Sequence, residues 1–419
     1  MLPEGWRIAS VDAVCETVSV GIVVNPSHYY VAEKEGTLAF RSGNVRENSV
    51  LDEKWVYLSP EGHAKNRKSE LRGGDVLVVR TGFAGAACVL PARYAGSNCI
   101  DIIFARPDQT QVLPEYLAQL TNSEIGRRQI LAGQSGLAQK HLNVATYAAM
   151  QFGLPPVPEQ RKIAEILSTW DKAIAAAERS MNCGTKQSRS LLTQILKGKC
   201  RLKRSETAHS ASTHRDLIPR DWRYLRIGDV AEEVSQKLGG NAKLPVLSCT
   251  KHQGLVDSLS YFKKQVFSLD TSTYKIVPRG CFVYATNHIE EGSIGFQDLY
   301  DAGLVSPMYT VFKTNDQICA AYLYALLKTE DYRQVFASAT NASVDRRGSL
   351  RWKDFQKIHI PVPPLPEQRK IGELIDVARR ESEVLRRRVA VLRKEKSALM
   401  AQLLTGRRRV RIPDAKVTA

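Results

Sequence analysis

The 419-residue sequence has no apolar run approaching 18 residues, whereas a transmembrane helix needs about 20. Its amino terminus lacks the basic segment, apolar stretch and cleavage site of a secretory signal. The eight cysteines are scattered and form no CxxC pair, which argues against both a disulfide framework and a zinc ribbon. We therefore expect a soluble, cytoplasmic protein with reduced thiols, no membrane association and no metal site.

Motifs for nucleotide chemistry are also missing. The sequence contains no GxxxxGK(S/T) phosphate-binding loop, so ATP hydrolysis within this chain is not expected. It also lacks the (N/D)PP(Y/F) loop of a DNA methyltransferase, because its two Pro-Pro pairs follow Leu154 and Val362. The histidines have no evident base or nucleophile partner, and we assign no catalytic residue. A few carboxylates have the chemistry to hold a metal, but without nuclease-like spacing we interpret them as turn or surface groups: Asp75, Asp101, Glu290 and Glu291.

Positive charge is abundant. Lys and Arg number 60 against 43 acidic residues, a net charge of +17. Such an excess favours a polyanionic partner, and nucleic acid is the leading candidate. A basic soluble protein without such a partner is the alternative that charge alone leaves open.

Two nearly identical segments organise the chain. The segment from Pro155 reads PPVPEQRKI and the one from Pro363 reads PPLPEQRKI, 208 residues later and identical at eight of nine positions. An opening LPEGW that ends at Trp6 is matched by IPRDW ending at Trp222. A separation of 208 residues is too long for a solenoid repeat. The sequence therefore predicts one module written twice.

A long helix is expected after each proline pair. Pro158 and Pro366 suit a helix start, and the glutamates that follow lie where the helix dipole favours negative charge. Apolar positions then alternate at spacings of four and three, as in a coiled-coil seam, up to glycines at 198 and 406 that suit helix ends. The seam positions are Ile163, Leu167, Trp170, Ile174, Ala177, Met181, Gly184, Ser188, Leu191 and Ile195, and then Ile371, Ile375, Ala378, Ser382, Leu385, Val389, Leu392, Lys396, Leu399 and Leu403.

The interiors of the two halves have diverged and read as mixed strand and helix. We expect strands within 71–80 and 277–284, helices starting at 116–120 and 322–326, and closing strands at 151–154 and 359–362. The predicted class is α+β, with two pseudo-repeated globular α/β domains separated by two long helices. The predicted parts are a first domain (1–154), a central helix (155–198), a linker (199–217), a second domain (218–362), a C-terminal helix (363–409) and a loosely held tail (410–419).

This series of elements resembles the specificity subunit of type I DNA restriction-modification enzymes. The resemblance covers nearly the whole chain, and the duplicated PPxPEQ with its helix is the specific part; Val157 replaces the more usual leucine. It implies two target recognition domains that each read half of a split double-stranded DNA target, with the two helices antiparallel as a spacer. It implies a non-catalytic reader that binds two methyltransferase subunits using S-adenosylmethionine, and restriction subunits using ATP and Mg. This chain itself would need no cofactor.

Other functions remain open at this point. One is a free-standing DNA-binding regulator or an anti-restriction decoy. Another is the recognition part of a split restriction and modification enzyme. A third is a coiled-coil assembly scaffold whose basic charge is incidental.

DNA contacts are expected in the diverged interiors, because base readout needs Arg, Lys, Asn or Gln aimed at base edges. The candidates are Lys65, Asn66, Arg67, Lys68, Arg80, Gln134, Ser135, Gln139 and Lys140 in the first half, and Lys251, Gln253, Asn287, Asn341, Ser343, Arg346, Arg347 and Arg351 in the second. The candidates for scaffold or partner contacts are Pro158, Glu159, Gln160, Arg161, Pro366, Glu367, Gln368 and Arg369. The basic residues of the second helix face spacer phosphates, a partner subunit or solvent, and the sequence does not choose among them.

Overall fold

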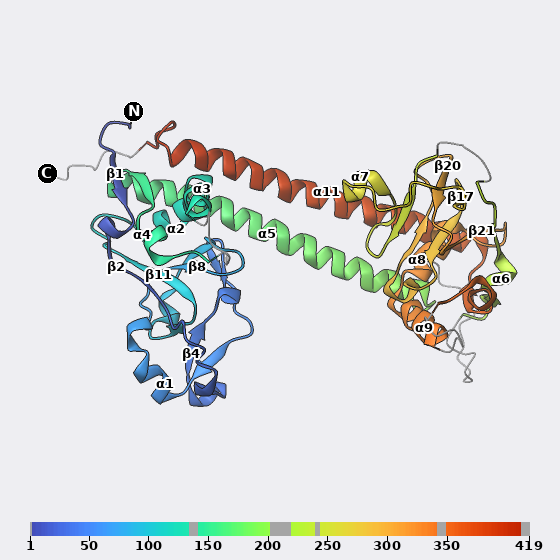
Figure 1. The fold of residues 1–419 in the computed structure, drawn as a ribbon, viewed down its shortest axis with the longest axis horizontal. Coiled ribbons are helices and arrows are strands. Elements are labelled where there is room, and N and C mark those ends of the chain that lie inside the picture. The colour runs from blue at the N-terminus through green and yellow to red at the C-terminus, as the bar shows by residue number, and fades with distance from the viewer. Residues whose placement is uncertain (1, 134–140, 202–218, 239–243, 342–348, 412–419) are drawn as a thin grey trace. The chain divides into compact units, whose positions relative to one another are not determined.

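The computed structural model describes residues 2–133, 141–201, 219–238, 244–341 and 349–411. The chain forms two compact units: unit 1 comprises Met1–Ser180 with Leu385–Ala419, and unit 2 comprises Met181–Val384. The boundary falls inside both long helices, α5 (Val157–Leu196) and α11 (Leu365–Leu403). Each unit therefore contains one mixed domain and two helix segments (Figure 1). Among the described residues, no helix combines the length and apolar character needed to cross a bilayer.

The domain of unit 1 consists of short strands and short helices. Its main antiparallel sheet has the order β2-β11-β8-β9, a second sheet has the order β10-β4-β7-β3, and β1 pairs with β12 so that the domain's two ends lie side by side. The elements are β1 (Arg7–Ser10), β2 (Cys15–Val20), β3 (Tyr30–Val31), β4 (Thr37–Phe40), β5 (Val45–Arg46), β6 (Ser49–Val50), β7 (Val56–Leu58), α1 (Pro60–Lys65), β8 (Val76–Val79), β9 (Ala87–Val89), β10 (Asn98–Cys99), β11 (Ile102–Pro107), α2 (Pro114–Asn122), α3 (Glu124–Ala132), α4 (Val144–Ala148) and β12 (Gln151–Leu154).

The domain of unit 2 repeats this plan. Its main antiparallel sheet has the order β14-β21-β18-β19, and β13 pairs with β22 as β1 pairs with β12. The elements are β13 (Arg223–Arg226), α6 (Ile227–Val230), β14 (Ala231–Glu233), β15 (Leu247–Thr250), β16 (Gly254–Asp257), α7 (Ser258–Phe262), β17 (Lys275–Pro278), β18 (Phe282–Ala285), β19 (Ile294–Phe296), β20 (Ala302–Val305), β21 (Tyr309–Thr314), α8 (Ala320–Leu327), α9 (Glu330–Asn341), α10 (Trp352–Phe355) and β22 (His359–Val362).

The main expectations for secondary structure are confirmed. The closing strands β12 and β22 have the expected bounds, β8 and β18 follow their glycine turns, and α2 and α8 are the expected helices. Both long helices begin one residue before the proline of the repeated motif and end just before glycines in left-handed conformation, Gly198 (φ +70°) and Gly406 (φ +71°). A side chain there would collide with Pro219 or Pro3 respectively.

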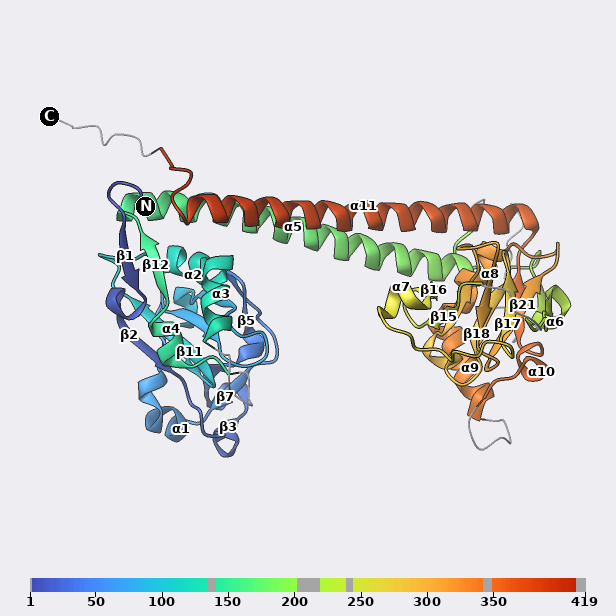
Figure 2. The same ribbon diagram turned by 45° about the horizontal axis from the view of Figure 1, so that its top comes forward.

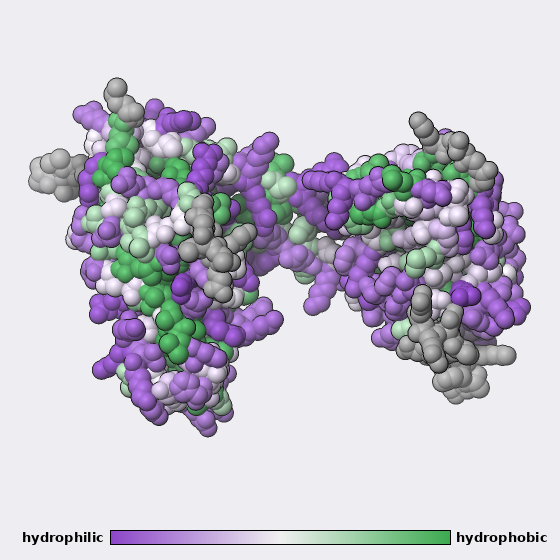
Figure 3. Space-filling view, in the orientation of Figure 1, coloured by the Kyte–Doolittle hydropathy of each residue, from purple (hydrophilic) through white to green (hydrophobic). Residues whose placement is uncertain are grey.

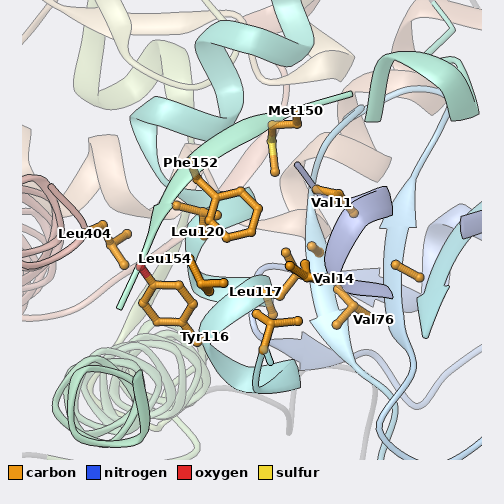
Figure 4. Packing of buried hydrophobic residues seen from close by; sticks show 14 of the residues in the cluster. Val11, Val14, Val76, Tyr116, Leu117, Leu120, Met150, Phe152, Leu154 and Leu404 are labelled. Atoms are coloured by element: carbon orange, nitrogen blue, oxygen red, sulfur yellow. The ribbon is translucent and has the colours of Figure 1, made fainter. Parts of the chain in front are cut away.

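The core of unit 1 joins the domain to the end of the chain. Tyr116 and Leu117 of α2 are fully buried with Val76 of β8 and Leu154 of β12. Leu404, just after α11, belongs to the same cluster and lies beside Tyr116 and Leu154 (Figure 4). The segment after Gly406 was expected to be frayed, but Val410 packs against this cluster and Arg409 pairs with Glu159, so that prediction is wrong for these two residues. Residues 412–419 lie outside the described range.

The two helix segments of unit 1 are antiparallel. The Lys396 ammonium donates to Asp171 at 2.6 Å, and Arg393 donates to Glu178 at 2.6 Å, so numbering rises along α5 as it falls along α11. Every predicted seam residue on either helix is buried or partly buried, except Leu191, which is 48% exposed. Its neighbour Leu192 is partly buried. A straight helix drifts by about 20° per heptad from a strict seven-residue repeat. This drift accounts for the burial of Leu192 in place of Leu191.

Candidate nucleic-acid interface

The repeated motif fixes each long helix to its own domain. In unit 1 the Glu159 carboxylate is 1% exposed; it accepts from Trp6 Nε1 at 3.1 Å and from Arg409 at 2.8 and 2.9 Å. In unit 2 the Glu367 carboxylate accepts from Trp222 Nε1 at 3.1 Å and from Arg201 at 2.9 Å. Each helix start is thus locked by an indole and by a guanidinium from the segment that follows a long helix.

The glutamines of the motif have a similar task. Gln160 is fully buried; its amide donates to the carbonyls of Pro155 and Gln111, and its oxygen accepts from the Leu113 backbone N–H. Gln368 repeats these three bonds with Pro363, Gln317 and Cys319.

The set was expected to serve as a scaffold or to contact a partner. The buried side chains of Glu159, Gln160 and Gln368 make scaffold contacts inside the chain. Glu367 is similarly used by Arg201 and Trp222. The exposed members of the set remain candidates for partner contact: Pro158, Arg161, Pro366 and Arg369. The linker was expected to span residues 199–217, but Arg201 within it also pairs with Asp221 at 2.8 Å. Residues 202–218 lie outside the described range.

In unit 2 a lysine gathers the loops that carry predicted DNA contacts. Lys328, at the end of α8, donates to the carbonyls of Lys251 at 3.0 Å and Gly292 at 2.8 Å. It thereby holds the β15–β16 turn, which contains Lys251 and Gln253, against the loop after β18, which contains Asn287. Burial lowers the pKa of Lys328. A charged donor shared between carbonyls offsets the cost of burying the ammonium.

A second connection places Arg351 in the same region. The backbone N–H of Leu350 donates to the Thr286 carbonyl at 2.7 Å. Arg351 directly follows the donor residue, and Asn287 directly follows the acceptor residue. Arg351 is exposed at the start of α10. Backbone contacts therefore connect the segments of unit 2 that carry the following predicted residues: Lys251, Gln253, Asn287 and Arg351.

In unit 1 the predicted contacts fall at two places. Arg80 follows β8 and donates to Asp101 at 2.7 Å, and Thr81 donates to the same carboxylate at 2.7 Å. The Thr81 hydroxyl also lies 3.1 Å from His141 Nδ1. These groups occupy one rim of the main sheet.

The second place is the basic cluster of α1 and the turn that follows it. Both views draw α1 at the end of unit 1 remote from α5 (Figures 1 and 2). Lys65 pairs with Glu61 at 2.7 Å, which raises its pKa, and Asn66 donates to the Gly62 carbonyl. Arg67 and Lys68 are exposed. Among the described residues no recorded bond links this cluster to Arg80.

The predicted late loops lie outside the described residues, and their DNA contacts stay predictions: Gln134, Ser135, Gln139, Lys140, Ser343, Arg346 and Arg347. The side chain of Asn341 is likewise outside the description. Of the basic set on α11, Arg393 pairs with Glu178 inside unit 1, and Arg379 lies 3.8 Å from Asp376.

The carboxylates considered for a metal have different surroundings. Asp75 is buried and paired with Arg106 through two bonds of 2.9 and 2.8 Å. His288, Glu290 and Glu291 have ligand atoms within 4.8 Å of one another. An exposed group of this kind is common without an ion, and it does not carry a metal site by itself.

A large groove opens in unit 1 beside the helix pair. Its volume is about 1690 Å³, and α2, α3 and the β5–β6 hairpin form one wall while α5 and α11 form the other. Gln119, which lines the groove, donates to Asp171 at 2.6 Å, and Asp171 also accepts from Lys396.

Hydrophilic side chains cover much of the surface in Figure 3. An apolar area lies over α7 of unit 2, where Leu259, Tyr261 and Phe262 are exposed.

Two residues that organise the candidate contact loops, Lys328 in unit 2 and Asp101 in unit 1, were missed from the sequence. Lys328 ends a helix with no local motif, and Asp101 was noted only as a weak metal candidate. The available signal was positional: Asp101 directly precedes a buried strand, β11, where side chains reach the rim of the sheet.

The duplicated domain and the duplicated long helices match a known protein family. The sequence model of the type I restriction modification DNA specificity domain matches residues 27–182 and 219–392. The chain belongs to this family. As a type I specificity chain it is 21% identical over 432 residues to the putative type I restriction enzyme MjaX specificity subunit of Methanocaldococcus jannaschii, covering 98% of this chain and 95% of that protein. The MjaVIII specificity subunit of the same organism is 23% identical, with 98% and 94% covered.

Solved structures show the same fold. A chain from work on complex assembly and conformational transition of the type I R-M system has a TM-score of 0.59 at 18% identity, covering 97% of this specificity chain and 99% of its own length. The S subunit from M. genitalium has a TM-score of 0.51 at 12% identity, with 95% and 96% covered. The predicted α+β class with two repeated domains is confirmed.

Proposed function

We propose that this chain is the DNA-reading subunit of a type I restriction-modification complex. Each domain reads one half of a split double-stranded target, and the paired helices hold two methyltransferase subunits, which restriction subunits then join. The chain supplies recognition and no catalysis. S-adenosylmethionine belongs to the methyltransferase partner, and ATP and Mg belong to the restriction partner.

The observation that carries this proposal is one scaffold with two sets of surface side chains. The indole, carboxylate and guanidinium lock at the helix start is the same in both units, whereas the loops that carry Arg80 in unit 1 and Asn287 in unit 2 differ. A duplicated reader with unlike loops suits a target whose halves differ in sequence. The excess of 17 positive charges supports DNA as the partner.

A flank of α11 supports the partner part of the proposal. Leu374, Val377 and Val384 are 39%, 51% and 64% exposed, although they lie within a long helix. Their spacing of three and seven residues places them on one side, away from the buried Ile371 and the partly buried Ile375. Such an apolar stripe fits a helix of another subunit.

The test is to express the full chain with its methyltransferase subunit in cells that lack other DNA methylation and to map the methylated sites. We expect one split motif with a fixed gap. Changing Val377 and Val384 to Glu should abolish co-purification with the methyltransferase, while Val24→Glu, at a 75% exposed site of unit 1, should leave it intact. A continuous palindrome, or methylation independent of this chain, would contradict the proposal.

A further inference from the structure

The rim of the main sheet has the same backbone frame in both units. In unit 1, β8 pairs with β11 so that Val79 faces Ile102; in unit 2, β18 pairs with β21 so that Ala285 faces Tyr309. The chain leaves the first strand of each pair one residue later, at Arg80 in unit 1. The corresponding residue of unit 2 is Thr286.

A backbone hydrogen bond from a distant segment completes each frame. The Leu142 N–H donates to the Arg80 carbonyl at 3.0 Å, and the Leu350 N–H donates to the Thr286 carbonyl at 2.7 Å. The two leucines are 208 residues apart, the same distance as the repeated motif. Strand register therefore identifies Arg80 and Thr286 as equivalent positions, and the hydrogen bonds from the two leucines identify them independently.

The side chains on this frame are different in the two units. In unit 1 Arg80 Nη1 donates to Asp101 Oδ1 and Thr81 donates to Asp101 Oδ2, both at 2.7 Å. In unit 2 the hydroxyl of Thr286 donates to the carbonyl of Met308, whose side chain is 60% exposed. One scaffold position thus presents a guanidinium held by a carboxylate in one unit and a short polar group beside an apolar one in the other.

We propose that Arg80 reads a guanine in the half-site of unit 1 and that Asp101 is the positioning residue that aims it. This inference rests on the proposed function and names the side chains that determine specificity within it. An Arg fork recognises the O6 and N7 atoms of guanine in the major groove. A carboxylate that fixes one nitrogen of the guanidinium removes rotamers that point elsewhere, so less conformational freedom is lost on binding.

The surroundings distinguish this pair from a structural ion pair. Asp75 and Arg106 of the same domain form a doubly bonded pair with side chains 1% and 16% exposed, whereas Arg80 and Asp101 are 23% and 36% exposed at the rim. Arg80 Nε is buried without a hydrogen-bond partner among the described residues. Among the described residues, the guanidinium is therefore not fully satisfied.

The backbone of Asp101 adds a second observation. Its φ is +50°, in the left-handed region, where the Cβ atom of a side chain comes close to the following carbonyl oxygen. The Asp101 N–H donates to the Ile22 carbonyl at 2.9 Å, which holds the residue in place. Strained positions persist where the surrounding structure fixes them, and they gather at binding sites. Here the strained turn places the carboxylate opposite the end of β8, where it meets Arg80.

The experiment uses the full chain assembled with its methyltransferase subunits and a duplex DNA library randomised at both halves of the target. Sequencing of the bound fraction gives the base preference at each position. Arg80→Ala should lower the preference for guanine at one position by roughly 5- to 100-fold, the discrimination of one bidentate contact. Asp101→Asn should reduce the preference at that same position, and the double variant should equal Arg80→Ala, because the two residues act as a unit.

Several controls separate reading from folding. Asn287→Ala should change the other half of the motif only, and Asp301→Asn, which alters an exposed aspartate paired with Arg279 in unit 2, should change neither. Arg80→Lys keeps the charge but loses the fork, so it should lose the guanine preference while still binding DNA at low salt. The melting temperature of Asp101→Asn should stay close to that of the wild-type chain.

The outcomes are distinct. A uniform loss of affinity at all positions would mean that Arg80 contacts phosphate and would overturn the assignment. So would an unchanged preference in Asp101→Asn, with or without a lower melting temperature. If the wild-type complex enriches no split motif, the proposed function itself fails; if it does and the variants keep the full preference, only this inference fails.

Discussion

Replacing Glu159 by Gln should destabilise unit 1, because this carboxylate closes the contact between domain and helix. Glu159 is 1% exposed and its main buried donor is the indole of Trp6, which is 8% exposed. A hydrogen bond to a charged group is worth about 1.5–3 kcal/mol. The Arg409 side chain is 46% exposed, so solvent screens its pair with Glu159 and we discount its contribution. Gln preserves the volume and one acceptor, so we expect a loss of about 2 kcal/mol.

Calorimetry of the full chain measures this loss. For a unit of this size 2 kcal/mol lowers the melting temperature by roughly 4–8 °C. Glu367→Gln should shift the transition of unit 2 by a comparable amount, because it breaks the equivalent bond with Trp222. Glu124→Gln is the matched control: its pair with Arg128 is more than 60% exposed on both sides, and its change should stay within about 0.5 kcal/mol. Equal shifts for Glu159→Gln and Glu124→Gln would refute the argument.

Two further predictions concern the helices. Lys396→Met should cost about 1–2 kcal/mol in urea unfolding because, among the described residues, it leaves Asp171 with the Gln119 bond alone. Adding Asp171→Leu should recover most of the loss, since an apolar pair can replace a largely buried ion pair without penalty; a double variant no more stable than the single one would count against this. Cys183 is exposed on α5, whereas burial raises the pKa of Cys88 to about 12. Thiol titration at pH 8 should therefore show a rapid phase that Cys183→Ser removes, with Cys88 reacting only on unfolding; a rapid phase that survives the substitution would disprove the assignment.

Much of the fold follows from two local signals. The spacing of Ile163, Leu167 and Trp170 and of their counterparts gave the long helices, because a seam is readable whenever apolar residues recur at a fixed period. The duplication predicted one plan for both halves, and the structure shows it in the matching strand pairs β1–β12 and β13–β22. Arg201 and Arg409 were placed in a linker and near a tail, because nothing local signals a contact with Glu367 or Glu159, which are 166 and 250 residues away.

The candidate site was less predictable, because base-reading groups depend on loop geometry. Arg80 and Asn287 were identified by residue type, but the equivalence of Arg80 with Thr286, the residue before Asn287, appears only through strand register and the bonds from Leu142 and Leu350. The cluster from Lys65 to Lys68 has the same composition as a reading cluster and yet lies at the end of α1 and in the turn after it, where no hydrogen bond among the described residues joins it to Arg80. Composition identifies side chains able to read DNA, and the sheet determines which of them share a rim.

The contact of the last helix with the first domain has a consequence for synthesis on the ribosome. Unit 1 needs Met400, Leu403 and Leu404 to cover its core and Arg409 to reach Glu159, whereas all the residues of unit 2 have been made by position 384. Domains usually fold in the order of translation. Here the nascent chain can complete its second unit while the surface around Tyr116 and Leu154 in the first still waits for its cover. Contacts between such distant segments also form slowly, so the amino-terminal unit is the last to mature and the one with most need of chaperone protection.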